Sequence, residues 1–342
     1  MKNNSDFSNK RIVISRTDSI GDVMLTLPIC YWIKTNFPTA TVIFLGKGYT
    51  LPILRSYSKI DEIVDWNDFN SVPTAQRTAK IKELNADIII HVFPNKEIAA
   101  LAKRAKIPQR IGTSHRNFHL LTCNIRPNFS RKKSDFHEAQ LNHELLKPFG
   151  LIDLPTMDEL NLTTADFKPK NVGLPSEIER FISVNKKCFI LHPKSQGSAV
   201  EWPMEKYLDL TQKLIDKNIA VMFTGTSAEG EIFSKEVSAK FENHPNVMNT
   251  AGLLTLNQLM ELISKVEGIV ACSTGPLHIA GFLGVKAVGL FSLKRPIHPG
   301  RWMPLGNNVS IITSSSKNKK QSAKTDIENI KDENVFEAIG LE

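Results

Sequence analysis

Few features of this 342-residue sequence point to a disulfide framework, a metal site or a membrane anchor. Its 4 cysteines are widely scattered, with no C-x-x-C pair and no histidine at metal-ligand spacing, so neither disulfides nor a zinc site is indicated. No apolar run approaches the ~18 residues of a membrane-spanning helix, and the polar N-terminus lacks the apolar stretch of a signal peptide. The sequence therefore predicts a cytoplasmic protein with reduced thiols.

Two common nucleotide-binding signatures are missing as well. No Gly-Lys-Ser/Thr is present, which excludes a Walker A loop. The first strand-to-helix turn lacks G-x-G-x-x-G, which weakens the case for a nicotinamide dehydrogenase. Hydrophobic residues make up 41% of the chain, which is enough for two domains with their own cores and excludes a disordered or fibrous protein.

Acidic residues are absent from the segment Ile98 to Ser134, in a chain whose net charge is +8. The overall charge points to an acidic partner, which could be nucleic acid, an anionic lipid surface or a phosphorylated substrate. A basic segment is usually a solvated face, but the complete lack of acids favours an anion-binding surface here. Its only aromatic residues are Phe118 and Phe129, so stacking on single-stranded nucleic acid has little support. The basic residues are Lys103, Arg104, Lys106, Arg110, Arg116, Arg126, Arg131, Lys132 and Lys133, with His115 and His119.

Short apolar runs alternate with segments of helical periodicity, a pattern typical of a parallel sheet with crossover helices. The predicted strands are Ile12–Ile14, Thr41–Leu45, Asp87–Val92, Cys188–Leu191, Ile219–Thr224 and Gly268–Ala271. The predicted helices are Asp22–Asn36, Thr74–Leu84, Met204–Lys217 and Leu256–Lys265. Between the two cycles, Leu151–Val184 is rich in Pro, Asp and Lys, and we expect it to hold a linker.

These elements predict an α/β protein with two domains, residues 1–165 and 166–342. The polar segment Ser314–Thr325 predicts a solvated loop, and Ile327–Ile339 predicts an amphipathic terminal helix. Two doubly wound domains facing each other would place the carboxyl ends of both sheets at one cleft. Ligands usually bind there in sheets of this type.

The segment Gly268 to Phe291 reads as a strand, a sharp turn, a short helix and a second strand. Ser273 or Thr274 can cap the helix, Pro276 suits a first helical position, and Gly275 lets the backbone approach a ligand closely. Unpaired N–H groups at such a helix start favour an anion, and His278 could add a hydrogen bond to a diphosphate. An ordinary βαβ crossover is an equally good interpretation of this segment alone.

The first strand runs into a turn in which Gly21 is followed by Asp22 at the start of a helix. Aspartate is a common helix cap, and that interpretation is favoured if nothing else is known. A single carboxylate at the mouth of a cleft is also what a general base requires.

Two loops of the second domain carry candidate ligand groups. Lys194 and Ser195 follow the strand that starts at Cys188 and could reach an anionic ligand, although a loop lysine is more often solvated. Glu229 follows the next strand, where nucleotide-binding folds often need an acceptor for ribose hydroxyls.

In order along the chain, four motifs resemble the series found in glycosyltransferase family 9, the bacterial heptosyltransferases of lipopolysaccharide core assembly. They are RTDSIGDVMLTLP (16–28), FILHPKSQGSAVEWP (189–203), FTGTSAEGE (223–231) and STGPLHIAGFLGV (273–285). The segments RIG (110–112), HEAQLNHELLKPFG (137–150) and RWMPLG (301–306) are also similar to the family. The ordered series is specific, whereas any one of these motifs alone would be weak.

The resemblance implies the GT-B fold, with two Rossmann-like domains facing a central cleft. It implies a nucleotide-sugar donor, ADP-heptose, on the C-terminal domain, a lipopolysaccharide-core acceptor on the N-terminal domain, and transfer with inversion without a cofactor or a required metal. Asp22 matches the catalytic base. The donor is expected to meet Lys194, Ser195, Glu229, Leu254, Ser273, Thr274, Gly275, Pro276 and His278, and the anionic acceptor Arg16, Arg110, His115, Arg116 and His119.

Two positions depart from the family pattern. Val200 stands where a Lys or Arg normally meets the donor, and Lys194 is a candidate substitute; Ser273 stands where an Asp normally touches the heptose. Three alternatives therefore stay open: a GT-B enzyme with another nucleotide sugar, such as an epimerase; a noncatalytic nucleotide-binding assembly subunit; and a nucleic-acid-binding protein, which only the charge supports. Peripheral contact with the inner membrane surface is a further expectation, because the acceptor is lipid-linked and the basic segment suits an anionic surface.

Overall fold

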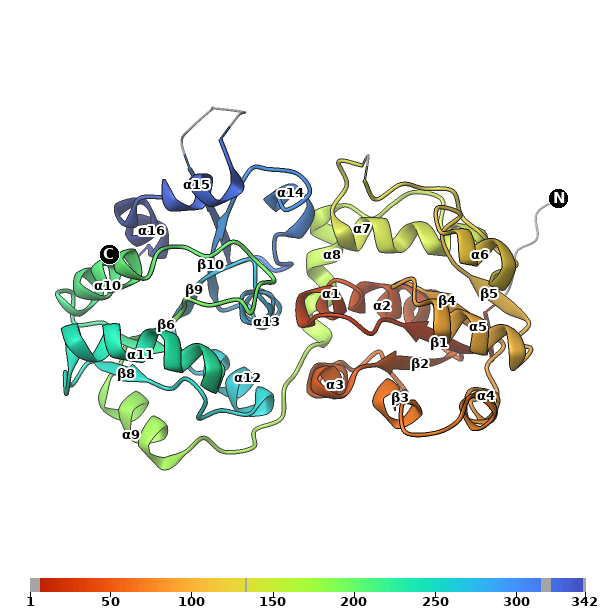
Figure 1. Cartoon of the computed structure of the whole chain (residues 1–342), viewed down its shortest axis with the longest axis horizontal. Coiled ribbons are helices and arrows are strands. Elements are labelled where there is room, and N and C mark those ends of the chain that lie inside the picture. Colours follow the sequence, from red (N-terminus) through yellow and green to blue (C-terminus); the bar gives the residue numbers. More distant parts are fainter. Residues whose placement is uncertain (1–6, 133, 315–320, 341–342) are drawn as a thin grey trace. The chain divides into compact units, whose positions relative to one another are not determined.

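In the computed structural model, which describes residues 7–132, 134–314 and 321–340, the chain divides into two compact units (Figure 1). Unit 1 is residues 1–168 and unit 2 is residues 169–342, compared with the expected boundary after residue 165. Lys133 of the basic segment and residues 315–320 of the polar C-terminal segment lie outside the described residues.

Unit 1 is built on a five-stranded parallel sheet in the order β3-β2-β1-β4-β5. The central strands are rich in Val and Ile, which suit a sheet covered on both faces. Val13, Ile43 and Ile89 pack on one face against Ile98 and Leu101. The strands are β1 Arg11–Ser15, β2 Thr41–Gly46, β3 Glu62–Asp65, β4 Ile88–His91 and β5 Gln109–Ile111.

The helices of unit 1 connect these strands and continue the chain beyond the sheet. The α-helices are α1 Ile20–Met24, α2 Leu27–Asn36, α3 Leu51–Arg55, α4 Thr74–Glu83, α5 Lys96–Arg104, α6 Asn117–Thr122, α7 Glu138–His143 and α8 Met157–Leu162. Short 3₁₀ turns occupy Gly48–Thr50, Trp66–Phe69, Glu144–Phe149 and Thr163–Asp166.

Unit 2 is built on a six-stranded parallel sheet in the order β11-β10-β9-β6-β7-β8. Its strands are β6 Cys188–His192, β7 Ala220–Phe223, β8 Val247–Asn249, β9 Gly268–Cys272, β10 Lys286–Phe291 and β11 Val309–Thr313. Its helices are α9 Ser176–Val184, α10 Met204–Ile215, α11 Ser227–Phe241, α12 Leu256–Ser264, α13 Gly275–Leu283, α14 Pro299–Trp302, α15 Ala323–Glu328 and α16 Asp332–Ile339.

Both sheets have the Rossmann strand order, in which the chain reverses direction across the sheet at one point. That point lies between β1 and β4 in unit 1 and between β6 and β9 in unit 2. Ligands bind at the carboxyl ends of the strands at such a switch point. The loops after these four strands are therefore where functional side chains are expected.

The helix expected over 22–36 is wrong, because it is interrupted at Leu25 and Thr26 to give α1 and α2. Pro28 causes the interruption: it has no N–H and its ring would clash with the carbonyl four residues earlier. Asn142 of α7 then donates to the Leu25 carbonyl oxygen at 2.9 Å. The segment expected as a linker also contains ordered helices, α8 and α9.

The single terminal helix expected over 327–339 is also wrong, because α15 and α16 replace it. The carbonyl of Ile330, between them, accepts from Trp202 Nε1 at 3.0 Å and from Lys206 Nζ at 2.7 Å. These side chains bind a backbone oxygen that a continuous helix would have used. The break fixes the C-terminal helices to α10 of the same unit.

Glycine allows α13 to pack closely against the segment that follows β10. A Cβ atom on Gly281 would lie 2.4 Å from the Leu305 carbonyl oxygen, and one on Gly306 would lie 2.1 Å from the Gly281 carbonyl oxygen. Gly306 also has a φ of +136°, which other residues rarely adopt. These two glycines seat α13 and so fix the direction of its N-terminus.

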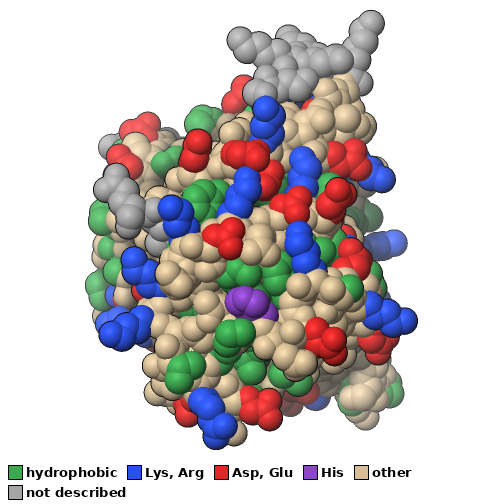
Figure 2. All heavy atoms as spheres, turned by 90° about the vertical axis from the view of Figure 1, so that its left-hand side faces the viewer, with side chains coloured by type: hydrophobic (Ala, Val, Ile, Leu, Met, Phe, Trp, Pro, Cys, Tyr) green, Lys and Arg blue, Asp and Glu red, His purple; other side chains and the backbone are tan. Residues whose placement is uncertain are grey.

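The face of unit 2 drawn in Figure 2 carries Lys and Arg side chains interspersed with Asp and Glu. Among the described residues, no helix is long and apolar enough to cross a bilayer.

Candidate active site

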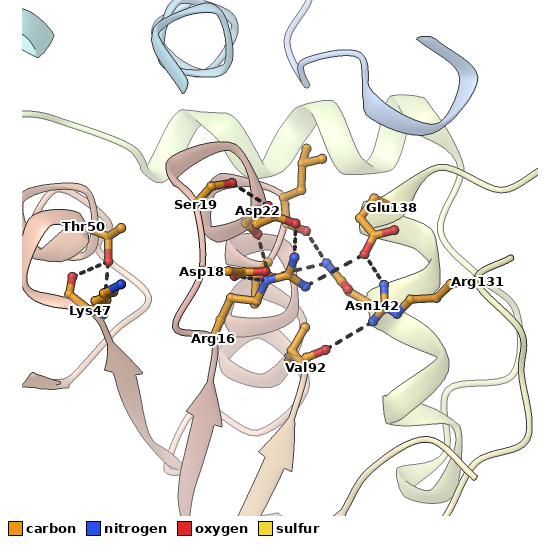
Figure 3. A network of polar contacts seen from close by, with 12 residues as sticks. Arg16, Asp18, Ser19, Asp22, Lys47, Thr50, Val92, Arg131, Glu138 and Asn142 are labelled. Atoms are coloured by element: carbon orange, nitrogen blue, oxygen red, sulfur yellow. Dashed lines mark hydrogen bonds and ion pairs between the residues drawn. The ribbon is translucent and has the colours of Figure 1, made fainter. Parts of the chain in front are cut away.

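The first group of polar side chains lies at the carboxyl end of β1 (Figure 3). Arg16 follows the last residue of β1 and is buried, with its side chain 4% exposed. Its Nε donates to Asp18 Oδ1 at 2.7 Å, and a terminal nitrogen donates to Asp22. Its other terminal nitrogen lies 3.8 Å from Glu138 Oε1. One buried guanidinium thus faces three carboxylates.

Glu138 is the buried acid of this group, with its side chain 2% exposed. It stands at the start of α7, pairs with Arg131, and lies near Arg16 on its other side. Arg131 also donates to the carbonyl of Val92, which follows β4, at 3.4 Å. The ion pairs therefore connect the loops after β1 and β4, which are the strands at the switch point.

The electrostatics of the group follow from burial and mutual charge. Burial disfavours the charged form of Arg16, but Asp22, Asp18 and Glu138 together raise its pKa. Burial raises the pKa of Asp18, which Arg16 opposes and the negative charge of Asp22 reinforces. Burial thus favours the protonated form of Asp18.

Asp22 is the carboxylate of this group that keeps access to solvent. It lies in the first turn of α1, and its side chain is 19% exposed. Arg16 donates to one oxygen and the Ser19 hydroxyl donates to the other. A carboxylate fixed by two donors and open on one side can accept a proton from a bound hydroxyl.

The second group lies at the carboxyl end of β9, where α13 begins. Thr274 is the N-cap residue and is 4% exposed, and its hydroxyl has no hydrogen-bond partner among the described residues. The N–H groups of Gly275 and Leu277 lie in the first turn, where a helix supplies no acceptor. His278 is 2% exposed, and its N–H donates to the Thr274 carbonyl at 3.4 Å. This helix start can receive an anion, because its donors and dipole favour negative charge.

The loop after β6 is organised by Glu201. Lys194 Nζ lies 3.2 Å from Glu201 Oε2, and the Ser195 N–H and hydroxyl both donate to Glu201 Oε1 at 2.9 Å. His192 ends β6, and burial lowers its pKa against the attraction of Glu229 and Glu201. The loop is therefore held in one conformation beside the switch point of unit 2.

Glu229 forms a capping box at the start of α11. Its carboxylate accepts from the Thr226 N–H at 2.8 Å and from the Gln196 N–H at 3.1 Å. It is 5% exposed. Glu229 therefore connects the loops after β6 and β7, while Leu254 and Ser273 are half-buried near the starts of α12 and α13.

The predicted acceptor residues are divided in the structure. Arg16 lies with Asp22, whereas Arg110 is bound to its own segment, where it donates to the carbonyls of Thr122 and Ile107. His119 is buried, which lowers its pKa, and its Nδ1 lies 2.9 Å from the Thr113 carbonyl oxygen. Arg116 is exposed, and His115 Nε2 lies 2.9 Å from Asn128 Oδ1. An acceptor-binding role for these residues stays a prediction.

Four residues of the two sites were not predicted from the sequence. They are Asp18, Arg131 and Glu138 around Arg16, and Glu201 in the loop after β6. Glu138 and Arg16 are far apart in the sequence, so no local pattern joins them. One signal was present: Glu138 comes shortly after the acid-free segment ends. Among the described residues, no group of three or more His, Cys, Asp and Glu side chains could hold a metal ion.

The fold of this chain matches that of solved heptosyltransferase structures. The fold matches that of E. coli ADP-heptose lps heptosyltransferase II, with a TM-score of 0.75, 18% identity and 97% of each chain covered. It also matches E. coli heptosyltransferase WaaC with ADP, with a TM-score of 0.72, 17% identity, and 96% of this chain and 99% of that chain covered. With its two units, each built on a parallel sheet covered by helices, this chain has the GT-B fold of these heptosyltransferase structures.

The sequence comparisons give the family. Lipopolysaccharide core heptosyltransferase OpsX from Haemophilus influenzae is 24% identical over 317 residues, covering 90% of this chain and 86% of that protein. The model of glycosyltransferase family 9 (heptosyltransferase) matches residues 76–331. The chain belongs to this family, and it is a glycosyltransferase.

Proposed function

We propose that this enzyme transfers a heptose from ADP-heptose to a sugar of the lipopolysaccharide core, with inversion at the anomeric carbon. The observation that carries the proposal is the held but accessible carboxylate of Asp22, at the carboxyl end of β1. Family membership supports it, as do the printed functions of the relatives, which include lipopolysaccharide heptosyltransferases.

In the proposed reaction Asp22 takes the proton from an acceptor hydroxyl. The hydroxyl oxygen then forms a bond to the anomeric carbon of the donor while the bond from that carbon to the diphosphate oxygen breaks. The electron pair of the broken bond leaves with ADP. A single displacement of this kind inverts the anomeric carbon, and a carboxylate base is suited to it.

The start of α13 is the proposed diphosphate site. The N–H groups of Gly275 and Leu277 and the hydroxyl of Thr274 are the donors available to the leaving phosphates. Pro276 has no N–H to contribute, and it starts the helix in the required conformation. His278 and Ser273 adjoin this turn and are two further proposed donor contacts.

The other proposed donor contacts come from the loops after β6, β7 and β8. Ser195 and Glu229 are mutually fixed through Glu201 and Gln196, so they offer a preformed edge for the nucleoside. Leu254 offers an apolar contact near the adenine. Val200 packs against the hydrophobic core of unit 2, so it cannot supply the basic contact that the family has at this position. Lys194, in the same loop, is the proposed replacement.

The acceptor and the cellular site are part of the same proposal. The acid-free basic segment of unit 1 suits an acceptor that carries phosphates or carboxylates. Arg116 and His115 are its most accessible members among the predicted acceptor residues. We place the enzyme in the cytoplasm, with peripheral contact with the inner membrane surface where a lipid-linked acceptor is found.

A donor panel tests the proposal. The purified chain is incubated with deacylated lipopolysaccharide core and, in parallel, ADP-heptose, UDP-sugars and GDP-sugars, while release of each nucleoside diphosphate is followed. We expect acceptor-dependent release of ADP from ADP-heptose. Acceptor-dependent release of UDP or GDP would keep the mechanism and change the identity of the donor sugar. Binding of ADP without release of a nucleoside diphosphate from any donor would contradict the proposal that the chain is an enzyme.

A further inference from the structure

Helix α6 of unit 1 is fixed to the domain through one of its faces. His119 is 0% exposed, its Nδ1 lies 2.9 Å from the Thr113 carbonyl oxygen, and its ring centroid lies 5.7 Å from that of His91. Gly112 makes room for it, because a Cβ atom there would lie 2.6 Å from the His119 ring. The rotation of α6 about its axis is therefore set by a buried histidine.

The opposite face of α6 presents two leucines to solvent. Leu120 is 57% exposed and Leu121 is 75% exposed. Successive helical residues are separated by ~100°, so these two side chains flank the line directly opposite His119. Two adjacent exposed leucines on a rigid helix keep apolar area in water that folding could have buried. The two leucines therefore offer an apolar contact surface on a helix whose orientation is fixed.

The chain on both sides of these leucines is basic. Arg116 immediately precedes α6 and is exposed. Arg126 follows the helix and is exposed, with a terminal nitrogen donating to the Cys123 carbonyl oxygen at 2.7 Å. No Asp or Glu lies between Ile98 and Ser134. The face of unit 2 in Figure 2 differs, because acidic and basic side chains alternate across it.

We propose that Arg116, Leu120, Leu121 and Arg126, here called the α6 patch, dock unit 1 on the surface of an anionic lipid bilayer. Leucine side chains at the patch enter the boundary between headgroups and acyl chains, while the arginines pair with lipid phosphates. The segment that carries the patch contributes no carboxylate of its own that an anionic surface would repel.

This inference deepens the proposed function and rests on it for its purpose, because a lipid-linked acceptor is found at such a surface. Binding to lipid itself needs neither donor nor acceptor. Arg116 of the α6 patch is also a predicted acceptor contact, so the test substitutes Leu120 and Leu121, to which no part in transfer is assigned. Docking and transfer can therefore be measured separately.

The experiment is co-sedimentation of the full chain with vesicles of phosphatidylcholine alone and of phosphatidylcholine with phosphatidylglycerol, at low and high salt. The test variant is the double substitution Leu120→Ser and Leu121→Ser. The matched control is Ile152→Ser with Ile232→Ser, since these isoleucines are 86% and 62% exposed in other places. Gel filtration of every protein reports its oligomeric state.

We expect the native chain and the control to bind the anionic vesicles, and the double leucine variant to bind about tenfold more weakly. High salt weakens binding, and transfer to soluble, deacylated acceptor is retained by the leucine variant. Equal vesicle binding by the leucine variant, or no binding by the native chain, would overturn the proposal. So would a native dimer that the leucine substitutions convert to a monomer, because a second copy would then cover the patch. Vesicle binding without sugar transfer to any acceptor would contradict the proposed function alone.

Discussion

Arg16 and Asp22 form an ion pair in which the arginine side chain is 4% exposed and the aspartate side chain is 19% exposed. The cation is thus enclosed, while the carboxylate can still be reached from solvent. Because Arg16 also contacts Asp18 and Glu138, its guanidinium is fixed from three sides. The side chain that we propose as the base is positioned by a residue that has little freedom to move.

Substituting Asp22→Asn removes the base and keeps the shape of the side chain. We expect the rate of transfer to fall by ~10²–10⁴-fold, since that is the usual contribution of a positioned base. The dissociation constant of ADP should stay within about twofold, because the proposed diphosphate site is in unit 2. Steady-state ADP release and titration with ADP measure the two quantities. Asp68→Asn is the control, and full turnover in Asp22→Asn would remove this residue from the role of base.

Glu138→Gln tests positioning through Arg16. The amide cannot pair ionically with Arg16 and Arg131, so we expect kcat to fall by about tenfold and the free energy of unfolding to fall by ~2 kcal/mol. The KM for the donor should not change. Glu144→Gln, which breaks a more exposed ion pair with Lys147, is the control and should cost no more than ~0.5 kcal/mol. If Glu138→Gln lowers the free energy of unfolding as expected but leaves kcat unchanged, the ion pairs around Arg16 stabilise the fold and do not position the base.

Thr274→Val tests the diphosphate site without changing the shape of the helix start. Loss of a hydroxyl that donates to a charged phosphate oxygen is expected to raise the dissociation constant of ADP by ~10-fold or more. Isothermal titration calorimetry gives this value directly. Thr211→Val is the matched control, because that buried hydroxyl donates to the Tyr207 carbonyl within α10. If both variants bind ADP as the native chain does, the start of α13 does not hold the diphosphate.

Lys194→Ala tests whether this lysine replaces the basic residue absent at position 200. Lys194 lies 3.2 Å from Glu201 and is partly exposed, so it can turn toward a phosphate of the donor. We expect the affinity for ADP-heptose to fall by about tenfold, in proportion to the loss of one charged contact. Surface plasmon resonance with immobilised protein measures it. Lys235→Ala on α11 is the control. Lys206→Ala is unsuitable because Lys206 binds the carbonyl of Ile330 in the C-terminal segment. Unchanged affinity for ADP-heptose in Lys194→Ala would show that Lys194 does not replace the basic residue absent at position 200.

The buried His91 makes stability depend on pH. Burial, with smaller contributions from His119 and Arg110, lowers the pKa of His91 to about 3. The unfolded chain therefore binds a proton at this site below pH ~6.5, while the folded chain does so only near pH 3. Stability from this group is complete above pH ~6.5 and is lost as the pH falls, by up to ~1.4 kcal/mol per pH unit.

His91→Leu should remove this part of the pH dependence. Urea unfolding between pH 5 and pH 7 is expected to give a shallower slope of the free energy of unfolding against pH than in the native chain. Ile90→Leu, a buried substitution on the same strand that removes no titratable group, should keep the native slope. An unchanged slope in His91→Leu would contradict the assignment of the buried neutral imidazole.

The sequence predicted the two α/β units because strands such as Ile12–Ile14 and Cys188–Leu191 are continuous apolar runs with polar loops after them. It also predicted the start of α13, because Thr274, Gly275 and Pro276 are local signals of a helix start. Strands β3, β5, β8 and β11 were missed. They lie toward the edges of the sheets, are short or only partly buried, and lack a strong apolar pattern.

The ion pairs around Arg16 could not be predicted in the same way. Arg16 and Glu138 are brought together by the packing of α7 against α2, and no spacing in the sequence encodes that contact. Likewise, Arg110 reads as one more basic residue, whereas the fold uses its guanidinium to close the loop around α6. Long-range contacts decide which charged side chains remain available to a ligand.

We propose that this chain moves heptose from ADP-heptose to a lipopolysaccharide-core acceptor, with Asp22 as the base. The decisive measurement is mass spectrometry of a deacylated core acceptor after incubation with ADP-heptose, with the native chain and Asp22→Asn compared side by side. We predict a mass gain of one heptose with the native chain and none with the variant. An unmodified acceptor with the native chain, or equal gain with both, would contradict the account.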